Sequence, residues 1–256
     1  MADGYQMNHI FEDIEVKENA IELLEASLKS RRKPTMIGTG AMTDPYMPLE
    51  RQLCFTRRSL EVIEKHGFGA TVLTKSDLIL RDLDLFRRIN EKTKAVAQIT
   101  LTTLDNDLSR LIEPNVCPTS RRVEVLREFQ RAGVPTVVWF CPILPFLTDR
   151  PENILSILDV CRDTGVKGII WYGAGVTLRD GDREYFYANL DRKFPGLKEL
   201  YIRRYGNSYE CPSPDAENLN RLFHDTCEKY GIWHDNDRVF TYLHTLEENE
   251  PQMSFF

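Results

Sequence analysis

The sequence predicts an α/β fold with a parallel sheet. Two observations support this prediction: five short apolar runs recur along the chain, and amphipathic helical patterns lie between them. The centres of the runs are 35, 27, 38 and 32 residues apart, which is the spacing of successive strand–helix units. A barrel and a doubly wound sheet both satisfy this spacing. The five centres are Ile37, Val72, Ile99, Val137 and Ile169.

The first quarter of the chain predicts two helices on either side of one strand. Residues 17–28 form an amphipathic pattern with Ile21, Leu24 and Leu28 on one stripe. The apolar run at 36–37 then leads through two glycines into a Thr-Asp-Pro turn, as a strand does when it delivers polar groups to the rim of a sheet. A second helix is expected over 49–66, and Gly67 is its stop signal.

The middle of the chain repeats this alternation. Further strands are expected over 70–74, 95–103, 136–144 and 168–171. The helical patterns between them cover 79–90, 105–112, 120–132 and 152–163, and glycines mark several of the helix ends. This part of the sequence therefore predicts the core of the sheet and the helices that cover it.

The pattern changes after Gly175. An aromatic-rich helix is expected over 183–193, a short helix ends near Tyr205, and Ser213 followed by Pro214 predicts the N-cap and first turn of a final helix. No linker rich in Pro, Gly or Ser precedes this region. We therefore expect a lead-in and helix over 1–34, a barrel core over 35–176 and a C-terminal helical cap over 177–256.

Composition excludes several classes of protein. A net charge of −6 gives no overall attraction to nucleic acid, although it leaves a local basic groove open. No apolar run reaches the length of a membrane span, and the acidic N-terminal segment lacks the pattern of a signal peptide. The six cysteines are scattered without a C-x-x-C pair, which predicts reduced thiols in the cytoplasm and no metal site within this chain.

Polar side chains gather where the predicted strands end. Asp44 can meet a ligand ammonium or ribose, and Lys75 can meet a ligand carboxylate, so together they suit an amino-acid-like cofactor. Two structural alternatives are open. Asp44 can simply satisfy local amides, and Lys75 can pair with Asp77 or Asp44. Thr43, Thr100 and Cys141 lie at the same predicted strand ends, and Cys141 is either a functional thiol or a small core residue.

Two further polar segments have both a functional and a structural interpretation. Ser120-Arg121-Arg122 can hold a phosphate at a helix N-terminus or form an exposed first turn. His234-Asp235-Asn236-Asp237 can bind a cation, although a solvated loop is the commoner outcome for such a run.

Four ordered motifs follow consecutive predicted strands. They are Gly40-Ala41-Met42-Thr43-Asp44-Pro45-Tyr46, Thr74-Lys75-Ser76 with Leu80-Arg81-Asp82-Leu83-Asp84-Leu85, Ile99-Thr100-Leu101-Thr102-Thr103-Leu104-Asp105, and Leu111-Ile112-Glu113-Pro114. Together with Tyr205-Gly206-Asn207-Ser208-Tyr209, they make nearly the whole chain resemble the spore-photolyase-like radical S-adenosylmethionine (SAM) proteins, also called DNA repair photolyase-like.

This resemblance implies a partial (βα) TIM-like barrel of the radical SAM type. It also implies a 4Fe-4S cluster and SAM as cofactors, with the SAM-contacting positions at Thr43, Asp44, Lys75 and Thr100. In the family, the reduced cluster cleaves SAM to methionine and a 5′-deoxyadenosyl radical, which abstracts hydrogen from a substrate. The cofactors supply that chemistry and the protein orients them. The substrate and the catalytic residues cannot be named from the resemblance.

One departure from the family affects the expected activity. The family's C-x3-C-x2-C loop and the strand before it have no counterpart in this sequence, which begins just ahead of the matching region. We therefore expect this chain to lack its first strand and to hold no cluster. The alternatives are a truncated or degenerate barrel that acts as a non-catalytic nucleotide-binding or interaction protein, and a conventional TIM-like enzyme that uses Lys75, Asp44 and Cys141 directly.

Overall fold

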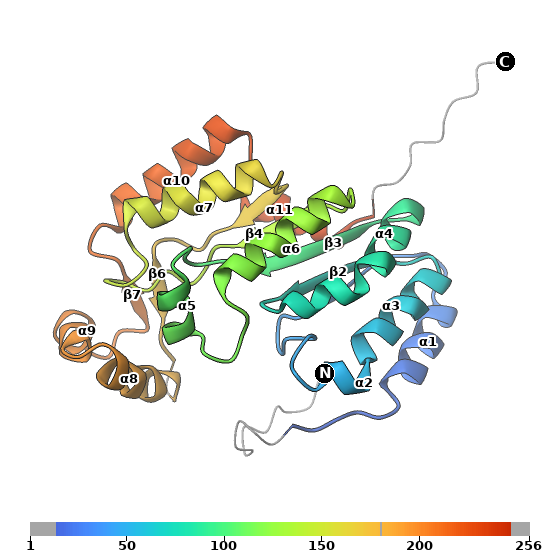
Figure 1. The fold of residues 1–256 in the computed structure, drawn as a ribbon, viewed down its shortest axis with the longest axis horizontal. Coiled ribbons are helices and arrows are strands. Elements are labelled where there is room, and N and C mark those ends of the chain that lie inside the picture. The colour runs from blue at the N-terminus through green and yellow to red at the C-terminus, as the bar shows by residue number, and fades with distance from the viewer. Residues whose placement is uncertain (1–13, 180, 247–256) are drawn as a thin grey trace.

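A computed structural model, which describes residues 14–179 and 181–246, shows a mixed α/β fold around one parallel sheet (Figure 1). The five strands lie in the order β1-β2-β3-β4-β5, and each pairs in parallel with the next. This order never reverses, so the sheet has no switch point and is not doubly wound. The strands are β1 (Met36–Thr39), β2 (Gly69–Thr74), β3 (Ala95–Thr100), β4 (Thr136–Trp139) and β5 (Gly168–Ile170).

The main hydrophobic core lies between one face of the sheet and a layer of helices. Alternate strand residues such as Val72, Ile99 and Val138 point into it, because side chains along a strand alternate between the two faces. Phe86 and Phe129, from two of the covering helices, meet edge to face there with ring centroids 5.2 Å apart. The helices in this layer are α1 (Ala20–Ser30), α3 (Phe55–Lys65), α4 (Leu83–Lys92), α6 (Thr119–Arg131) and α7 (Pro151–Asp163).

The last two helices pack against the sheet and its covering helices and not over the strand ends. Helix α10 (Ala216–Tyr230) packs on α7 and contributes Phe223 to the main core. Helix α11 (Asn236–His244) covers part of the opposite face of the sheet. There Val239 and Leu243 form a second, smaller core with Val96, Val137 and Ile170 of the strands. Between these two helices, Trp233 forms a single parallel bridge to Gly168 at the outer edge of β5.

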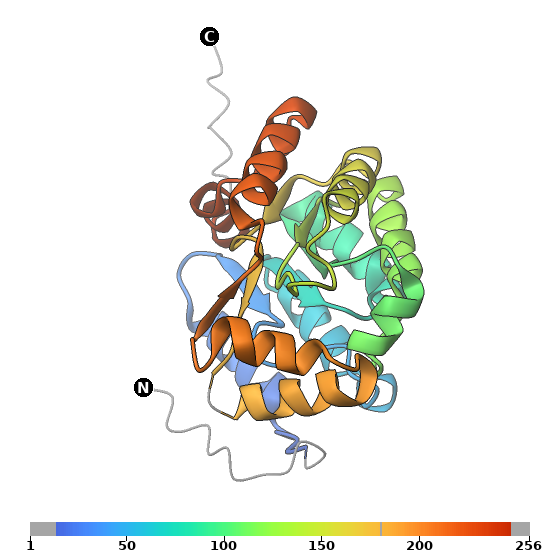
Figure 2. The same cartoon turned by 90° about the vertical axis from the view of Figure 1, so that its left-hand side faces the viewer.

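A smaller group of elements lies where the strands end. It comprises α5 (Asn106–Ile112), α8 (Asp182–Lys193), α9 (Leu197–Tyr205) and a two-stranded antiparallel sheet of β6 (Gly175–Thr177) and β7 (Glu210–Pro212). Figure 2 faces this side, with α8 and α9 in orange across the front. The Lys193 ammonium donates to the Leu111 carbonyl at 2.7 Å, and the Tyr201 hydroxyl donates to the Pro145 carbonyl at 2.9 Å. These bonds tie α8 to α5, and α9 to the loop that follows β4.

Several predicted boundaries are wrong. The expected helix over 49–66 is two helices, α2 (Glu50–Leu53) and α3, separated by Cys54 with a φ of 52°. The expected helix over 79–90 begins as a 3-10 turn, η1 (Asp77–Asp82), and continues as α4. Strand β4 ends at Trp139 instead of continuing to 144, since Pro142 has no N–H to give to a ladder.

The predicted start of the C-terminal helix is also wrong. Helix α10 begins at Ala216, and Ser213 does not cap it: its hydroxyl donates to Asp149 Oδ2 at 2.6 Å. The sequence patterns did not predict α11, and the solvated-loop interpretation of 234–237 is therefore only partly correct. Asp235 is the N-cap of α11, and its carboxylate accepts from the Arg238 backbone N–H at 2.8 Å.

Candidate functional site

Asp44 joins the ends of the first two strands. Its Oδ1 accepts from the Thr74 hydroxyl at 2.6 Å and from the Tyr46 backbone N–H at 2.9 Å, and its Oδ2 accepts from the Lys75 backbone N–H at 2.8 Å. The carboxylate therefore satisfies local amides, as the structural alternative predicted. It also fixes the loop after β1 against the end of β2.

A network of charged side chains around the buried Asp82 anchors the loop that contains Asp44. The Tyr46 hydroxyl donates to Asp82 Oδ2 at 3.1 Å, and Asp82 is fully buried. Two guanidinium groups neutralise this carboxylate: Arg57 at 3.0 Å and Arg81 at 2.8 Å. Burial and the Asp82 charge both raise the pKa of Tyr46 well above 10, so its hydroxyl stays protonated and remains a donor.

Lys75 pairs with a carboxylate that the sequence analysis did not single out. Its ammonium lies 2.5 Å from Glu113 Oε1, and not against Asp77 or Asp44, the partners named in the structural alternative. The other oxygen of Glu113 lies 2.7 Å from Arg122, a side chain that is only 1% exposed. Burial alone raises the pKa of Glu113, but the charges of Lys75 and Arg122 outweigh it and hold the pKa below 4.5.

Arg122 extends this network to the third strand. Its guanidinium donates to the Thr100 carbonyl at 3.2 Å and to the Cys117 carbonyl at 3.1 Å, and the Cys117 thiol donates to the Lys75 carbonyl at 3.1 Å. Arg122 is thus an interior residue, and Arg121 pairs with Asp77 at 3.1 Å. Neither arginine presents the free phosphate-binding turn that the sequence allowed.

The structure therefore places the four predicted cofactor positions at one edge of the sheet, with different surroundings. Asp44 and Lys75 are in direct contact, and Thr100 is linked to Lys75 through Arg122 and Glu113. Thr100 is buried, and its hydroxyl makes no hydrogen bond within the described part of the chain. Thr43 is exposed beside Asp44. Glu113 was quoted in the sequence analysis only within a motif, and Arg122 only in a possible phosphate-binding turn; the pairing of Glu113 with both Lys75 and Arg122 was not predicted.

Cys141 lies close to this site but carries no reactive thiolate. Burial raises the pKa of its thiol to about 12, although the nearby positive charge of Lys75 opposes the shift. Only the thiolate is a strong nucleophile, so the protonated group at neutral pH does not suit covalent catalysis. The raised pKa gives no support to a conventional enzyme that attacks its substrate through Cys141.

A cavity of about 270 Å³ opens beside Lys75 and Glu113. The inner side of α8 forms one wall, and the loops after β2, β3 and β4 form the others. Most of its lining is apolar, with a few convergent polar groups, as is typical of small-molecule sites. The residues from α8 and its C-terminal end are Tyr185, Phe186, Asn189, Leu190, Lys193 and Phe194.

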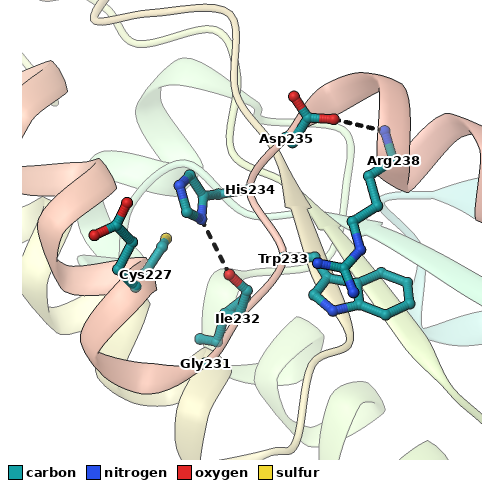
Figure 3. Close-up of a pocket in the computed structure, with 8 residues that line it drawn as sticks. Cys227, Gly231, Ile232, Trp233, His234, Asp235 and Arg238 are labelled. Carbon is teal, nitrogen blue, oxygen red and sulfur yellow. Dashed lines mark hydrogen bonds between the residues drawn. The ribbon is translucent and has the colours of Figure 1, made fainter.

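A second cavity, of about 260 Å³, lies away from these strand ends, beside the Trp233 bridge to the start of β5 (Figure 3). Its polar groups already have structural roles. The His234 ring lies 3.2 Å from the Ile232 carbonyl, Asp235 caps α11, and the Arg238 guanidinium stacks on Trp233 with its carbon 3.9 Å from the ring centroid. This cavity is therefore not the candidate site.

Two further properties concern metals and membranes. Within residues 14–179 and 181–246, no three His, Cys, Asp or Glu side chains gather where they could hold a metal ion. None of the helices in those same ranges combines the length and the apolar character that a bilayer crossing requires.

Comparison with known proteins finds distant relatives. No protein-family model matches the chain. An uncharacterized protein of Mycobacterium tuberculosis is 26% identical over 220 residues, which cover 85% of this chain and 64% of that protein. An uncharacterized protein of Methanocaldococcus jannaschii is 31% identical over 134 residues, covering 52% of this chain and 49% of the relative. The chain thus spans at most about two thirds of the length of these curated relatives.

Solved structures show what the fold resembles. A spore photoproduct lyase variant with bound AdoMet and dinucleoside spore photoproduct matches with a TM-score of 0.60 at 14% identity, covering 84% of this chain and 64% of that chain. SuiB of Streptococcus suis, bound to S-adenosylmethionine, matches with a TM-score of 0.52 at 12% identity, covering 89% of this chain and 45% of that chain. The mixed α/β fold of this chain, with its five-stranded parallel sheet, is therefore similar to the folds of radical SAM enzymes.

Proposed function

We propose that this chain is a SAM-binding protein of the spore-photolyase-like radical SAM group. Its five-stranded sheet is the corresponding partial barrel, and the cofactor lies over the strand ends at Thr43, Asp44, Lys75 and Thr100. The observation that carries this proposal is the contact between Asp44 and Lys75 at the carboxyl edge of a parallel sheet, where ligands of such folds bind. The fold likeness to two enzymes whose structures contain SAM supports it.

The free bonding capacity of these residues fits the polar groups of SAM. A carboxylate has about four acceptor positions, and Asp44 uses three of them, which leaves one for an ammonium or a ribose hydroxyl. The Lys75 side chain is 37% exposed, and its ammonium has donors beyond the one directed at Glu113, so it can also bind the cofactor carboxylate. The Thr100 hydroxyl, unused within the described part of the chain, completes the donor set.

The iron–sulfur cluster does not fit the described residues, which contain no group of ligands for it. A cluster held by residues outside the described ranges would supply the radical chemistry of the family. The residues of this chain would contribute binding and orientation: Lys75 and Asp44 fix the amino-acid part of SAM, and α8 screens the strand ends from water.

Titration calorimetry with SAM tests the proposed site. Asp44→Ala and Lys75→Ala should each weaken binding by about tenfold or more, because each removes a charge-assisted contact. Lys75→Ala keeps the Glu113–Arg122 pair, so the fold should persist. Asp107→Ala and Lys198→Ala alter exposed charges outside the site and serve as matched controls. Equal affinities in all five proteins would reject the site assignment.

Anaerobic reconstitution with iron and sulfide separates the radical enzyme from a non-catalytic nucleotide-binding or interaction protein. We expect the 256-residue chain to bind SAM without cleaving it under strong reductant. Release of methionine and 5′-deoxyadenosine, with one cluster per chain, would show instead that residues outside the described ranges supply the ligands. A chain that binds neither SAM nor a cluster would favour the interaction protein.

A further inference from the structure

The cavity under α8 has an apolar body and a polar end. One wall is formed by Ile112 at the end of α5 and by Pro142 and Leu144 in the loop after β4. The opposite wall is formed by Phe186, Leu190 and Phe194 from α8 and its C-terminal end. Lys75 and Glu113 lie on the strand-end side, and Lys193 lies on the α8 side. A ligand in this cavity would bury apolar surface along most of its length and meet charge at defined points.

The charges around this cavity are not balanced. Glu113 is the acidic residue in the lining, and its carboxylate is shared by Lys75, which also lines the cavity, and by the buried Arg122, which does not. Lys193 adds a third positive charge. Lys193 is a half-buried residue whose ammonium donates to the Leu111 carbonyl at 2.7 Å, and no carboxylate pairs with it among the described residues. A half-buried cation without an anion gains stability when a ligand supplies one.

We propose that this cavity binds a small amphipathic carboxylate, with its apolar body between α8 and the strand-end loops and its carboxylate at Lys193. Such a ligand would be the substrate if the proposed SAM site is correct, and this identification as substrate rests on that function. In this arrangement Lys75 binds the cofactor and Lys193 binds the substrate. Nucleic-acid strands are bound in open basic grooves with stacked bases, whereas this cavity is small and apolar-walled.

Octanoate is a suitable probe because it combines an apolar chain with one carboxylate. We expect calorimetry to show one-to-one binding to the full chain. Asn189→Trp, which fills the cavity from α8, should weaken binding by about tenfold or more. Ala188→Trp introduces the same side chain at the neighbouring exposed position and should leave the affinity within about twofold. Urea unfolding midpoints of both variants show whether α8 keeps its packing.

The charge assignment has its own pair of variants. Lys193→Gln should weaken octanoate binding by about tenfold, whereas Lys198→Gln, at a residue paired with Asp191, should not. Octanol lacks the negative charge. Its affinity for the wild-type chain should therefore not exceed the affinity of octanoate for Lys193→Gln. Equal binding of octanol and octanoate would overturn the carboxylate specificity.

Other outcomes overturn the cavity itself. The inference fails if octanoate does not bind, or if it binds with the same affinity to Asn189→Trp. It also fails if Asn189→Trp abolishes binding of a thymidine dinucleotide and leaves octanoate unaffected, because the cavity would then take a nucleotide. SAM titrated in parallel distinguishes the two proposals. If the wild-type chain binds octanoate but does not bind SAM, the proposed cofactor site is rejected and the proposed carboxylate site is retained.

Discussion

Glu113 pairs with Lys75 on the strand-end side of the cavity, with 2.5 Å between Glu113 Oε1 and Lys75 Nζ. The other oxygen of the same carboxylate neutralises Arg122, which is fully inside the protein. One carboxylate therefore links the end of β2 to the backbone of β3 through Arg122. The position of Lys75, and hence of the proposed SAM site, depends on a residue that need not touch the ligand.

Glu113→Gln should destabilise the protein strongly. The substitution leaves the buried Arg122 guanidinium without its anion, and loss of one partner from a buried ion pair costs about 3 kcal/mol or more. The free energy of unfolding in urea measures this loss. Glu217→Gln is the control, because Glu217 pairs with Arg221 on the exposed side of α10 and its removal should cost less than about 0.5 kcal/mol. Equal losses for the two variants would contradict a special role for Glu113.

The same carboxylate predicts a dependence of stability on pH. The pKa of Glu113 in the folded protein is lower than its usual value of 4.5, so its ionised form stabilises the fold at any pH above that value. This contribution should disappear as the pH falls below about 4.5 and the folded carboxyl takes up its proton. Urea unfolding from about pH 6 down to about pH 3 should show a shallower decline for Glu113→Gln than for wild type.

Asp44→Asn tests the structural role of Asp44, whose carboxylate accepts hydrogen bonds from backbone N–H groups and a hydroxyl. An amide has one acceptor oxygen, so its NH2 group must face either Thr74 or the Lys75 N–H. We expect a loss of about 1–3 kcal/mol and faster hydrogen exchange of the Lys75 amide. Exchange of the Val72 amide within β2 should change much less, and uniform acceleration across β2 would point to global loosening instead.

Local sequence patterns were sufficient to predict most of the sheet and its covering helices. All five expected strands exist, because each apolar run is bounded by glycine or by polar turn residues that end it. Helix α11 was missed because it is short and follows a polar run. The available signal was Asp235 as an N-cap, followed by Val239 and Leu243 four residues apart on one face. The break at Cys54 had no local signal, since a positive φ at a cysteine is imposed by its surroundings.

The candidate site could be predicted only in part, for a different reason. Parallel strands end at a common edge, so the nearness of Asp44 to Lys75 follows from the order of the strands alone. The partner of Lys75 does not follow. Asp77 is closer along the chain, but it pairs with Arg121, and Glu113 reaches Lys75 through the position of α5. Ion pairing of this kind depends on tertiary placement, which spacing in the sequence does not encode.

Gln98 connects three strands on the face that α11 partly covers, and its removal should be costly. Its amide donates to the Thr71 hydroxyl at 2.7 Å, and its oxygen accepts from the Trp139 indole at 2.7 Å. Gln98→Leu leaves both partners unsatisfied, with an expected loss of about 1–3 kcal/mol. In NMR spectra the Trp139 indole N–H should shift, whereas that of Trp171, bonded to Asn220, should not. Gln130→Leu, at an exposed position on α6, should change stability by less than about 0.5 kcal/mol.

Gly40→Ala is the most direct test of how closely the Asp44 loop approaches β2. Gly40 has a φ of +106°, and a Cβ there would lie 2.1 Å from the Leu73 carbonyl oxygen. This oxygen belongs to a strand paired on both sides, so it cannot easily move away. Gly67 has a φ of +70° but open space around its missing side chain, which makes Gly67→Ala a matched control for the backbone conformation alone.

The two alanine variants should therefore differ. Gly67→Ala should cost about 1–2 kcal/mol, the penalty of a left-handed conformation for an L-residue. Gly40→Ala should cost at least about 3 kcal/mol in urea unfolding, because the steric clash adds to that penalty. It should also weaken SAM binding, since relief of the clash displaces Asp44 from Lys75. Equal stability losses in the two variants would show that the loop moves freely, and that its close approach to β2 does not fix the position of Asp44.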